Sequence, residues 1–258
     1  MPTYKVIIEY DGTRYSGWQE QQNATTIQGT ILNVIQELSP GARLAGSGRT
    51  DAGVHALGQV AHLISSDQRD PRKFTDKLNR RLPRDINILR MEEVPPRFHA
   101  RHDAIERYYI YQVALRRSAF YKKYIWWVRE RIDMNRIEQR LPELKGLHDF
   151  SAFADKRRSD EESGKVLLTE CSLTRDGDML LFRFGGSHFI WKMVRRLVGV
   201  LVAVGMGTLP DEPLAKLVKE RHSDFAALTA PASGLFLEYV RYKGDPPPPP
   251  LRAITPLR

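Results

Sequence analysis

The order of apolar and polar residues in the first half of the chain predicts strands separated by helices. Residues 4–10 are apolar-rich, partly alternating, and end at Asp11-Gly12, which is typical of a strand that enters a turn. Apolar residues then recur over 27–38 at the spacing of one helical face, with Thr25-Thr26 in front as candidate N-caps. The same reasoning predicts a strand at 59–64, a helix at 71–82 and a strand at 86–91.

The second half repeats this alternation more loosely. Its pattern predicts strands at 107–115, 166–174, 179–184 and 235–242, and helices at 134–141, 188–206 and 211–220, the last capped at Thr208 or Asp211. Strands with interspersed helices and hairpin turns indicate an α+β fold with a largely antiparallel sheet. Asp245 and the five prolines 246–250 can continue neither a sheet nor a helix, so residues 244–258 are expected to form an extended, flexible tail.

A glycine-rich stretch, residues 46–56, interrupts this pattern between a helix and a strand. It contains three glycines and places Arg49 two positions before Asp51. A tight turn is the ordinary interpretation, but eleven residues exceed what a turn needs, and glycine permits close backbone approach. A dinucleotide-binding loop is excluded, because Asp51 stands where the third glycine of that fingerprint belongs.

Composition narrows the choice of partner. The chain has 258 residues, 41% of them hydrophobic, and its 40 Lys and Arg exceed its 31 Asp and Glu by a formal charge of +9. An excess of this kind favours an anionic macromolecule, either nucleic acid or an anionic membrane surface. The longest apolar run, 197–206, is about half of the roughly 20 residues that span a bilayer, and no secretory leader opens the chain. With Cys171 as its only cysteine, the chain is expected to be soluble and cytoplasmic.

Asp51 and Arg49 are the first candidates for chemistry. An aspartate with an ordinary pKa near ~3.9 is an anion at neutral pH, so Asp51 could attack an electrophilic carbon without a separate base. Arg49 could orient that carboxylate or clamp a phosphate, because its guanidinium matches both. The plain alternative is a surface ion pair of little energetic value.

Aromatic and basic residues in the second half form two further candidates. Alternation on the strand at 107–115 sends Tyr108 to one face and Tyr109 and Tyr111 to the other; two of these rings are expected to pack, and one beside Arg107 could stack on a nucleobase. On the long helix, Arg195 and Arg196 either need a carboxylate partner such as Asp51 or form, with Lys192, a solvated edge.

Basic clusters elsewhere suit an RNA backbone, although each alone is typical of a solvated surface: they are Arg80-Arg81 with Arg84, Arg116-Arg117, Lys122-Lys123 near Trp126-Trp127, and Lys156-Arg157-Arg158. On a helix, His99 and His102, three residues apart and followed by Asp103, could share a metal. Pro95-Pro96 argues against the helix that would bring these histidines together, so no metal is expected.

Taken together, these motifs resemble the TruA-type tRNA pseudouridine synthases over residues 4–242. The matching segments are Tyr10-Asp11-Gly12-Thr13, Gly17-Trp18-Gln19, Gly48 to Ala56, Phe98-His99-Ala100-Arg101, Arg107-Tyr108, Gly146 to Phe153, Met193-Val194-Arg195 and Ala230 to Leu235. Two departures are the run Phe189-Ile190-Trp191-Lys192, where bacterial members commonly have a Phe-Leu-x-His-like run, and the proline tail.

The resemblance implies a catalytic set of Asp51 as the essential carboxylate, Arg49 placing the flipped nucleotide, Tyr108 against the target base and Arg195 as the ionic partner of the carboxylate. His55, Arg107, Lys192 and Arg196 are then expected to bind substrate. It further implies two similar α/β lobes around an active-site cleft, here 1–105 and 106–243, with a central mixed, mainly antiparallel sheet flanked by helices.

As partners and substrate, the resemblance implies a homodimer without metal or organic cofactor that isomerises uridines of the tRNA anticodon arm, at tRNA positions 38, 39 or 40. Two other functions remain open on the residues alone. One is a noncatalytic RNA-binding protein, supported by charge and aromatic residues; the other is a metal-dependent RNA hydrolase built on His99, His102 and Asp103.

Overall fold

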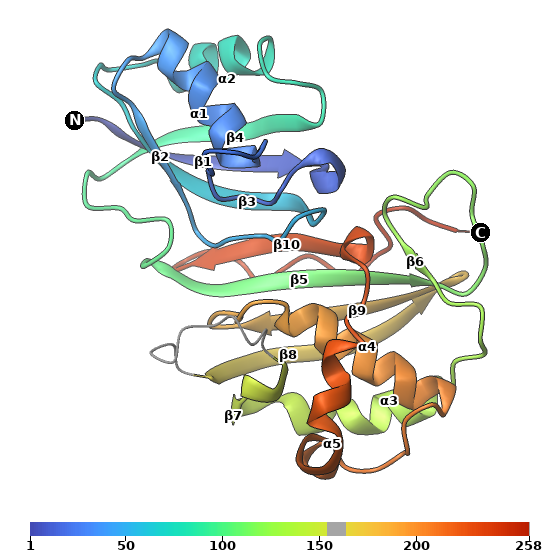
Figure 1. The fold of residues 1–258 in the computed structure, drawn as a ribbon. Coiled ribbons are helices and arrows are strands. Elements are labelled where there is room, and N and C mark those ends of the chain that lie inside the picture. Colours follow the sequence, from blue (N-terminus) through green and yellow to red (C-terminus); the bar gives the residue numbers. More distant parts are fainter. Residues whose placement is uncertain (154–163, 258) are drawn as a thin grey trace. The chain divides into compact units, whose positions relative to one another are not determined.

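The computed structural model describes residues 1–153 and 164–257, which divide into two compact units (Figure 1). Unit 1 comprises Met1–Ile105 and Phe236–Pro248, and unit 2 comprises Glu106–Leu235 and Pro249–Arg258. The sequence analysis assigned the last strand to the second lobe. The structure instead pairs that strand within unit 1, so each unit is built from two separated stretches of the chain.

Unit 1 is organised around strand β1 (Thr3–Tyr10). This strand pairs antiparallel with β3 (His55–Ile64) on one side and with β4 (Ile86–Val94) on the other. β3 also pairs antiparallel with the short β2 (Arg43–Gly46) and parallel with β10 (Leu235–Tyr242). The sheet of this unit is therefore mixed and mainly antiparallel.

Two helices pack on the sheet of unit 1. α1 (Ile27–Leu38) begins at Thr26, whose hydroxyl accepts a hydrogen bond from the amide of Gly29, as expected from its sequence. α2 (Pro71–Asn79) begins after Asp70 in the same way, with proline at its first position. Asn79 fixes α2 to β4, because its side chain exchanges two hydrogen bonds with the backbone of Ile88.

In unit 2 the long strand β5 (Ala104–Ala114) pairs antiparallel with β9 (Met179–Gly186), which pairs with β8 (Lys165–Asp176), and β8 with β7 (Gly146–Asp149). The two-residue strand β6 (Trp126–Trp127) runs parallel to β5. The predicted α+β class with a mixed, mainly antiparallel sheet and flanking helices is thus confirmed. The predicted cleft between two lobes stays a prediction.

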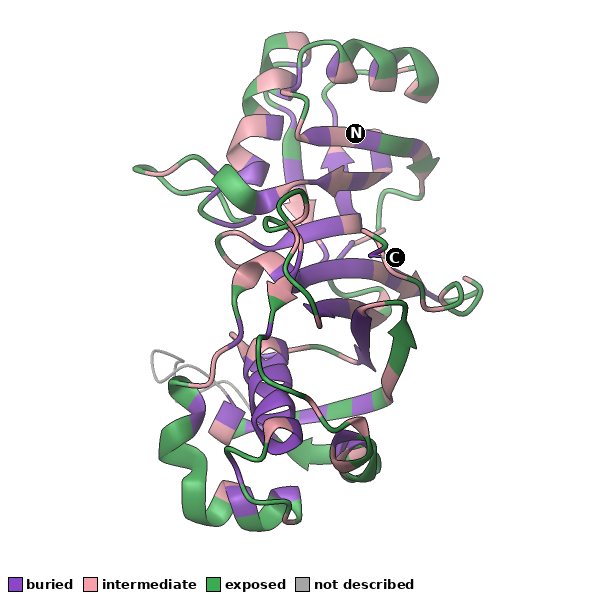
Figure 2. Ribbon diagram, turned by 90° about the vertical axis from the view of Figure 1, so that its right-hand side faces the viewer, coloured by how far each residue is buried: buried purple, intermediate pink, exposed green. Residues whose placement is uncertain are grey.

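Three helices complete unit 2: α3 (Met134–Arg140), α4 (Met193–Met206) and α5 (Leu214–Arg221). Figure 2 colours α4 almost wholly as buried. Glycines let its neighbours approach: a Cβ at Gly199 would lie 1.6 Å from the carbonyl oxygen of Leu228, and one at Gly205 would lie 2.8 Å from Ile137. Among the described residues, no helix combines the length and apolar character that crossing a bilayer requires.

Two helix starts were predicted wrongly. α4 begins at Met193 rather than near His188, because Lys192 adopts a left-handed conformation (φ 62°) that interrupts any helix before it. α5 begins at Leu214 without a side-chain cap from Thr208 or Asp211. Glu143, from a segment distant in sequence, accepts a hydrogen bond from the amide of Leu214 at 2.6 Å and takes the place of that cap.

Residues 244–257, the part of the tail that the structure describes, contain neither helix nor strand, as the prolines predict, but they are not a free appendage. Leu257 is buried in a cluster that contains Ala114, Ile125, Met179 and Leu181. The backbone amides of Ile254 and Ala253 donate hydrogen bonds to the side chains of Gln112 and Asp176. The sequence analysis treated residues 244–258 as one proline-rich segment and overlooked the apolar residues that follow the prolines.

Three histidine rings pack together in unit 1. The ring of His99 lies 4.5 Å from that of the buried His62 on β3 and 4.2 Å from that of His102. The Nδ1 atom of His62 accepts a hydrogen bond from the amide of Ala100, which requires this atom to be unprotonated. Burial and the neighbouring His99 lower the pKa of His62, while Asp103 opposes the shift; burial and His102 lower the pKa of His99.

This cluster predicts a loss of stability in weak acid. Because His62 has a lower pKa folded than unfolded, the unfolded chain binds more protons below pH ~6.5, and the free energy of unfolding falls as the pH falls from 7 to 5.5. His62→Gln keeps an acceptor but cannot titrate, so it is expected to flatten this dependence in urea unfolding. The exposed His222, replaced by Gln, serves as the control. An unchanged slope in His62→Gln would remove His62 from this explanation.

Candidate active site

Arg49 and Asp51 lie in the loop between β2 and β3, residues 47–54, hereafter the acidic loop. Asp51 is half-buried and Arg49 is exposed, with its Nε donating to the Oε1 of Gln19 at 3.2 Å. The sequence analysis expected the glycines of this loop to shape it for contact. The structure agrees in that the loop is irregular and partly open to solvent, whereas its neighbours β2 and β3 are paired.

The segment that follows β1, residues 11–18, supports the acidic loop from within unit 1. The amide of Trp18 donates to the carbonyl of Thr50 at 3.0 Å, and the amide of Gly53 donates to that of Tyr15 at 3.3 Å. The hydroxyl groups of Thr50 and Tyr10 lie 2.8 Å apart in a buried hydrogen bond. The residues on both sides of Asp51 are therefore fixed by the backbone of one neighbouring segment.

Two glycines of this supporting segment permit the close contact. A Cβ at Gly12 would lie 2.0 Å from the carbonyl oxygen of Val54, and one at Gly17 would lie 2.6 Å from that of Thr50. Gly17 also has a positive φ of 95°, which side chains rarely adopt. These residues fall in the motifs 10–13 and 17–19, whose structural role the sequence alone did not reveal.

A second support comes from the β3 side of the loop. The amide of Ser47 donates to the carbonyl of Val60, and its hydroxyl donates to the Oε1 of Gln59 at 2.8 Å. The Nε2 of Gln59 in turn donates to the carbonyl of Gly48 at 3.0 Å. The side chain of Gln59 is fully buried, so its bond with Ser47 is sheltered from water, whereas its bond to Gly48 is partly buried. The sequence analysis did not name Ser47 or Gln59, because a polar residue in a strand carries no signal of where its side chain bonds.

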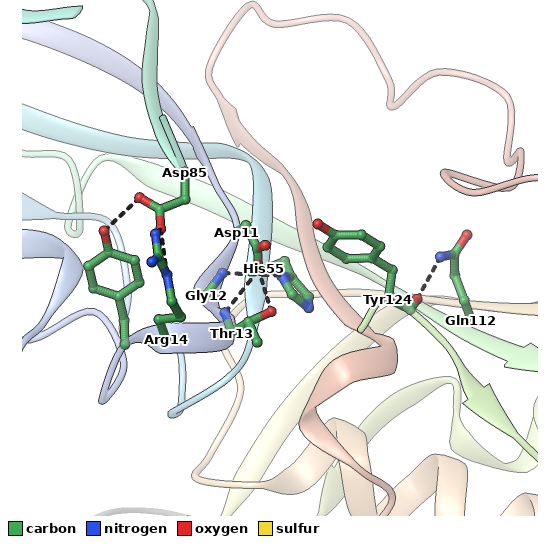
Figure 3. Close-up of polar contacts among 9 residues, drawn as sticks. Asp11, Gly12, Thr13, Arg14, His55, Asp85, Gln112 and Tyr124 are labelled. Atoms are coloured by element: carbon green, nitrogen blue, oxygen red, sulfur yellow. Dashed lines mark hydrogen bonds and ion pairs between the residues drawn. The ribbon is translucent and has the colours of Figure 1, made fainter. Parts of the chain in front are cut away.

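His55 lies behind the acidic loop rather than on its surface. It is 1% exposed, and its ring stacks on that of Phe236 with centroids 4.7 Å apart. Its Nδ1 lies 3.1 Å from the amide of Gly12 and 3.1 Å from the carboxylate of Asp11 (Figure 3). The substrate-binding role expected for His55 stays a prediction; in the structure its position is that of a residue that holds the acidic loop against residues 11–12.

Asp85 anchors the other end of this supporting segment. It accepts hydrogen bonds from Arg14 at 2.6 Å and from the hydroxyl of Tyr15 at 2.7 Å (Figure 3). Burial alone would raise the pKa of Asp85, but the hydrogen bonds from Arg14 and Tyr15 outweigh it and hold this pKa below its ordinary value. Burial and the bond to Asp85 raise the pKa of Tyr15, which keeps its proton on the hydroxyl.

In unit 2, Tyr108 of β5 lies opposite Gly185 of β9. Its ring packs over Gly185 of β9, where an added Cβ would come within 2.4 Å of it, and its hydroxyl donates to Glu106 at 2.9 Å. The side chain is 4% exposed. Gly185 and Glu106 thus account for the burial of this ring within unit 2.

Arg195 belongs to the opposite face of β5. Its Nε donates to the carbonyl of Ala230 at 2.7 Å, and the amide of Ala230 donates back to the carbonyl of Arg195. The next residue, Pro231, accepts the hydroxyl of Tyr111 at 2.7 Å. Burial raises the pKa of Tyr111 and the charge of Arg195 opposes that shift, which also places the two side chains near each other.

Strand alternation therefore separates Tyr108 from Arg195 within unit 2. Tyr109 and Tyr111 point to the face that carries Arg195, and Tyr111 is buried whereas Tyr109 is half-exposed, with its ring edge-on to Phe189 at 5.0 Å. The assignment of Tyr108 as the ring against the base stays a prediction, whereas the exposure and face of Tyr109 make that residue the better candidate. The alternation itself was legible in the sequence, but the location of the helix carrying Arg195 was not.

The other predicted residues of unit 2 differ in exposure. Arg107 is half-buried and its guanidinium donates to the carbonyl of Ser187 at 2.8 Å. Arg196 is 6% exposed with its Nε 3.4 Å from the hydroxyl of Thr229, so it does not form the solvated edge that was considered for it. Lys192 is half-buried, lies 5.1 Å over the ring of Trp191, and is the only residue other than glycine with a positive φ in the described chain.

The remaining basic and histidine candidates are distributed over separate segments. Arg80, Arg81 and Arg84 are exposed in unit 1, and residues 156–158 lie outside the described residues. Among the residues that the structure describes, no group of three or more His, Cys, Asp or Glu side chains has a metal-binding arrangement. The alternative built on His99, His102 and Asp103 therefore gains no support from the geometry.

The close backbone contact at Gly12 generates a prediction for this site. Gly12→Ala places a methyl group against the carbonyl of Val54, so it is expected to lower the free energy of unfolding by roughly 1–3 kcal/mol. It should also increase amide hydrogen exchange at Trp18 and Gly53, whose bonds hold the loop. Gly48→Ala is the matched control, because its Cβ would meet no atom within 4 Å. Equal stability of the two variants would contradict this account of the support.

Comparison with known proteins identifies the family. A family model described as tRNA pseudouridine synthase matches residues 6–103 and 141–243. The protein named tRNA pseudouridine synthase A of Acetivibrio thermocellus is 39% identical over 94% of this chain and its own full length. The protein of that name from Levilactobacillus brevis is 36% identical over 98% of both chains.

The protein of that name from Rhodopseudomonas palustris is 39% identical over 94% of this chain and its own full length. Among solved structures, a chain of a Cbf5-Nop10-Gar1 complex has a TM-score of 0.37 at 11% identity over 77% of this chain and 45% of its own, too distant a likeness to carry an argument. The two matched ranges include the acidic loop and Arg195, and on these grounds the chain belongs to the tRNA pseudouridine synthase family.

Proposed function

We propose that this chain converts uridine to pseudouridine in the anticodon arm of tRNA, with Asp51 as the essential carboxylate. Isomerisation of uridine in tRNA is the activity that the family and its named relatives support. The observation that supports the role of Asp51 is its place in a loop held on two sides, at Thr50 and at Ser47, by buried hydrogen bonds, while its own side chain is half-buried. The anticodon arm, and tRNA positions 38, 39 or 40 within it, follow from the resemblance.

The reaction exchanges one bond of the ribose for another. The bond between C1′ and N1 of the uracil breaks, the base rotates, and a bond forms between C1′ and C5. The hydrogen of C5 leaves as a proton and N1 takes up a proton, so the product is an isomer of the substrate. Asp51, already ionised at neutral pH, assists the first cleavage through a covalent adduct with either the sugar or the base. A base inside a stem has to be extruded first, at a cost of a few kcal/mol that contacts to the RNA must offset.

The neighbouring residues are assigned by their faces and exposure. Arg49, exposed two positions before Asp51, places the flipped nucleotide through its phosphate or ribose. Tyr109 replaces Tyr108 as the ring against the base, since it shares the face of Arg195 and is half-exposed. Arg195 is the ionic partner proposed for Asp51, and Lys192 and Arg107 contribute to RNA binding.

Assembly, cofactor use and location complete the proposal. By the resemblance, the chain acts as a cytoplasmic homodimer in which one tRNA touches both subunits, without metal or organic cofactor. The net charge of +9 supports tRNA as the partner, because cationic surface releases counterions from the phosphate backbone.

Release of tritium from tRNA labelled at C5 of uridine tests the catalytic proposal. The wild type should release tritium in the presence of EDTA, whereas Asp51→Asn and Asp51→Ala should lower release by at least about 10⁴-fold, the size of loss seen when a nucleophilic group is removed. Both variants should still bind tRNA. Tritium release that survives Asp51→Ala would refute the assignment of Asp51 as the essential carboxylate. If Asp51→Asn kept every activity of the protein, that result would favour the noncatalytic RNA-binding alternative.

The same phenylalanine substitution at two adjacent tyrosines, Tyr108 and Tyr109, tests which face of β5 meets the target base. If the Tyr109 hydroxyl moves a proton in the reaction, Tyr109→Phe should lower kcat by about 10²-fold. Tyr108→Phe removes only a hydroxyl bonded to Glu106 and keeps the ring over Gly185, so kcat should change by less than about threefold. A larger loss in Tyr108→Phe than in Tyr109→Phe would restore the original assignment.

A further inference from the structure

A loop of unit 2 presents an aromatic ring among cations and belongs to no part of the proposed catalytic set. Residues 116–125, hereafter the basic loop, connect β5 to β6. Phe120 at its tip is 87% exposed, and Arg117, Lys122 and Lys123 around it are also exposed. Residues 115–128 contain four Lys or Arg and no Asp or Glu, so the local charge is of one sign.

The base of this loop is fixed while its tip is open. Gln112 on β5 donates to the carbonyl of Tyr124 at 2.9 Å (Figure 3), and the amide of Tyr124 donates to the carbonyl of Tyr121 at 2.8 Å. Arg116 forms an ion pair with Asp178 at 2.8 Å, which neutralises the acidic group of the adjoining hairpin. The exposed Phe120 is therefore carried by a supported loop rather than by a loose one.

The end of the chain provides part of that support. Leu257 is packed with Ile125, and Tyr121 lies against the same buried cluster. Gln112 joins the two segments, since its Oε1 accepts the amide of Ile254 at 2.7 Å while its Nε2 donates to Tyr124. The segment after the prolines and the basic loop are thus one packed structure within unit 2.

This combination of a ring and cations suits one class of partner. Unpaired nucleobases stack on aromatic side chains for about 1–3 kcal/mol each, and the phosphates that flank them pair with Lys and Arg. A second protein surface would have to supply acidic groups around an apolar pocket. The Lys and Arg residues around Phe120 can bind anions, and RNA carries a phosphate at every step of its backbone.

We propose that the basic loop is an RNA contact separate from the acidic loop: Phe120 stacks on an unstacked base of the tRNA, and Arg117, Lys122 and Lys123 hold the neighbouring phosphates. The inference rests on the proposed function for its substrate. Leu257 and Gln112 are positioning residues, because they fix the loop without touching RNA. The proline-rich segment acquires a role here, since it leads the chain to the site where Leu257 docks.

The test measures the Kd of the full chain for a tRNA transcript by fluorescence anisotropy, alongside tritium release. Phe120→Ala should raise Kd and KM by about 5- to 100-fold, the equivalent of one lost stacking contact, and leave kcat within about twofold. Phe120→Trp should restore binding, because its ring can also stack. Lys122→Gln should raise Kd and lower the slope of log Kd against log salt concentration by about one, the share of one phosphate contact. Lys77→Gln on α2 should change neither quantity.

Matched controls separate the competing outcomes. Leu147→Ala removes another exposed apolar side chain, 63% exposed on β7, and should leave Kd unchanged. A Kd of Phe120→Ala within twofold of wild type would overturn the proposal. The proposal would also be overturned if Phe120→Ala and the wild type differed in molecular mass in solution, measured by light scattering. That result would assign Phe120 to a contact with a second copy of the chain.

The positioning role has its own readout. Leu257→Ala should raise Kd in the wild-type background and raise it by less in the Phe120→Ala background, since the ring, one of the groups that the support positions, is then already absent. Additive effects of the two substitutions would contradict that role. Failure of the proposed function and failure of this inference give different results. In the first case the wild type binds tRNA without releasing tritium. In the second case it releases tritium, and the Phe120 variants bind tRNA with the Kd of the wild type.

Discussion

The candidate active site depends on a contact between two backbones that leaves no space for side chains. Residues 11–18 and the acidic loop approach so closely that Gly12 and Gly17 each face a carbonyl oxygen of the loop where a Cβ would stand. Hydrogen bonds between the same segments then fix the residues on both sides of Asp51. A carboxylate that must meet an extruded nucleotide needs such fixed geometry, because small displacements in a site are costly to the reaction.

The buried polar residues around the loop reinforce this arrangement from behind. His55 faces Asp11 and the amide of Gly12, while Gln59 links Ser47 to the carbonyl of Gly48. The side chains of His55, Gln59 and Ser47 are buried and have partners, so their hydrogen bonds contribute more than those of an exposed loop. The polar residues of the acidic loop and its surroundings thus divide into an outer pair, Arg49 and Asp51, and an inner set that holds them.

Periodicity alone was sufficient to place the fold class and most of the elements. The strand at 235–242 and the helix at 27–38 with its Thr26 cap were predicted with their observed bounds, because both carry local signals. The start of α4 and the cap of α5 were not predictable, since they depend on the left-handed Lys192 and on Glu143, a partner distant in sequence.

The site shows the same limit. Asp51 and Arg49 stood out by residue type, whereas the burial of His55 and Arg196 and the faces of Tyr108 and Tyr109 depend on which strand and helix lie beside them. Short strands such as β6, only two residues long, carry no periodic signal at all.

The discontinuous composition of the two units has a consequence for how the chain is made. β3 receives its parallel partner only from Phe236–Leu237, and the cluster around Ile125 receives Leu257 only from the far end of the chain. During synthesis from the N-terminus, most of each unit therefore leaves the ribosome before the unit can complete its core. Unit 1 needs Phe236–Leu237 and unit 2 needs Leu257. Nascent chains stalled before that point would expose an open strand edge and an unfilled apolar pocket, which are the features that recruit chaperones.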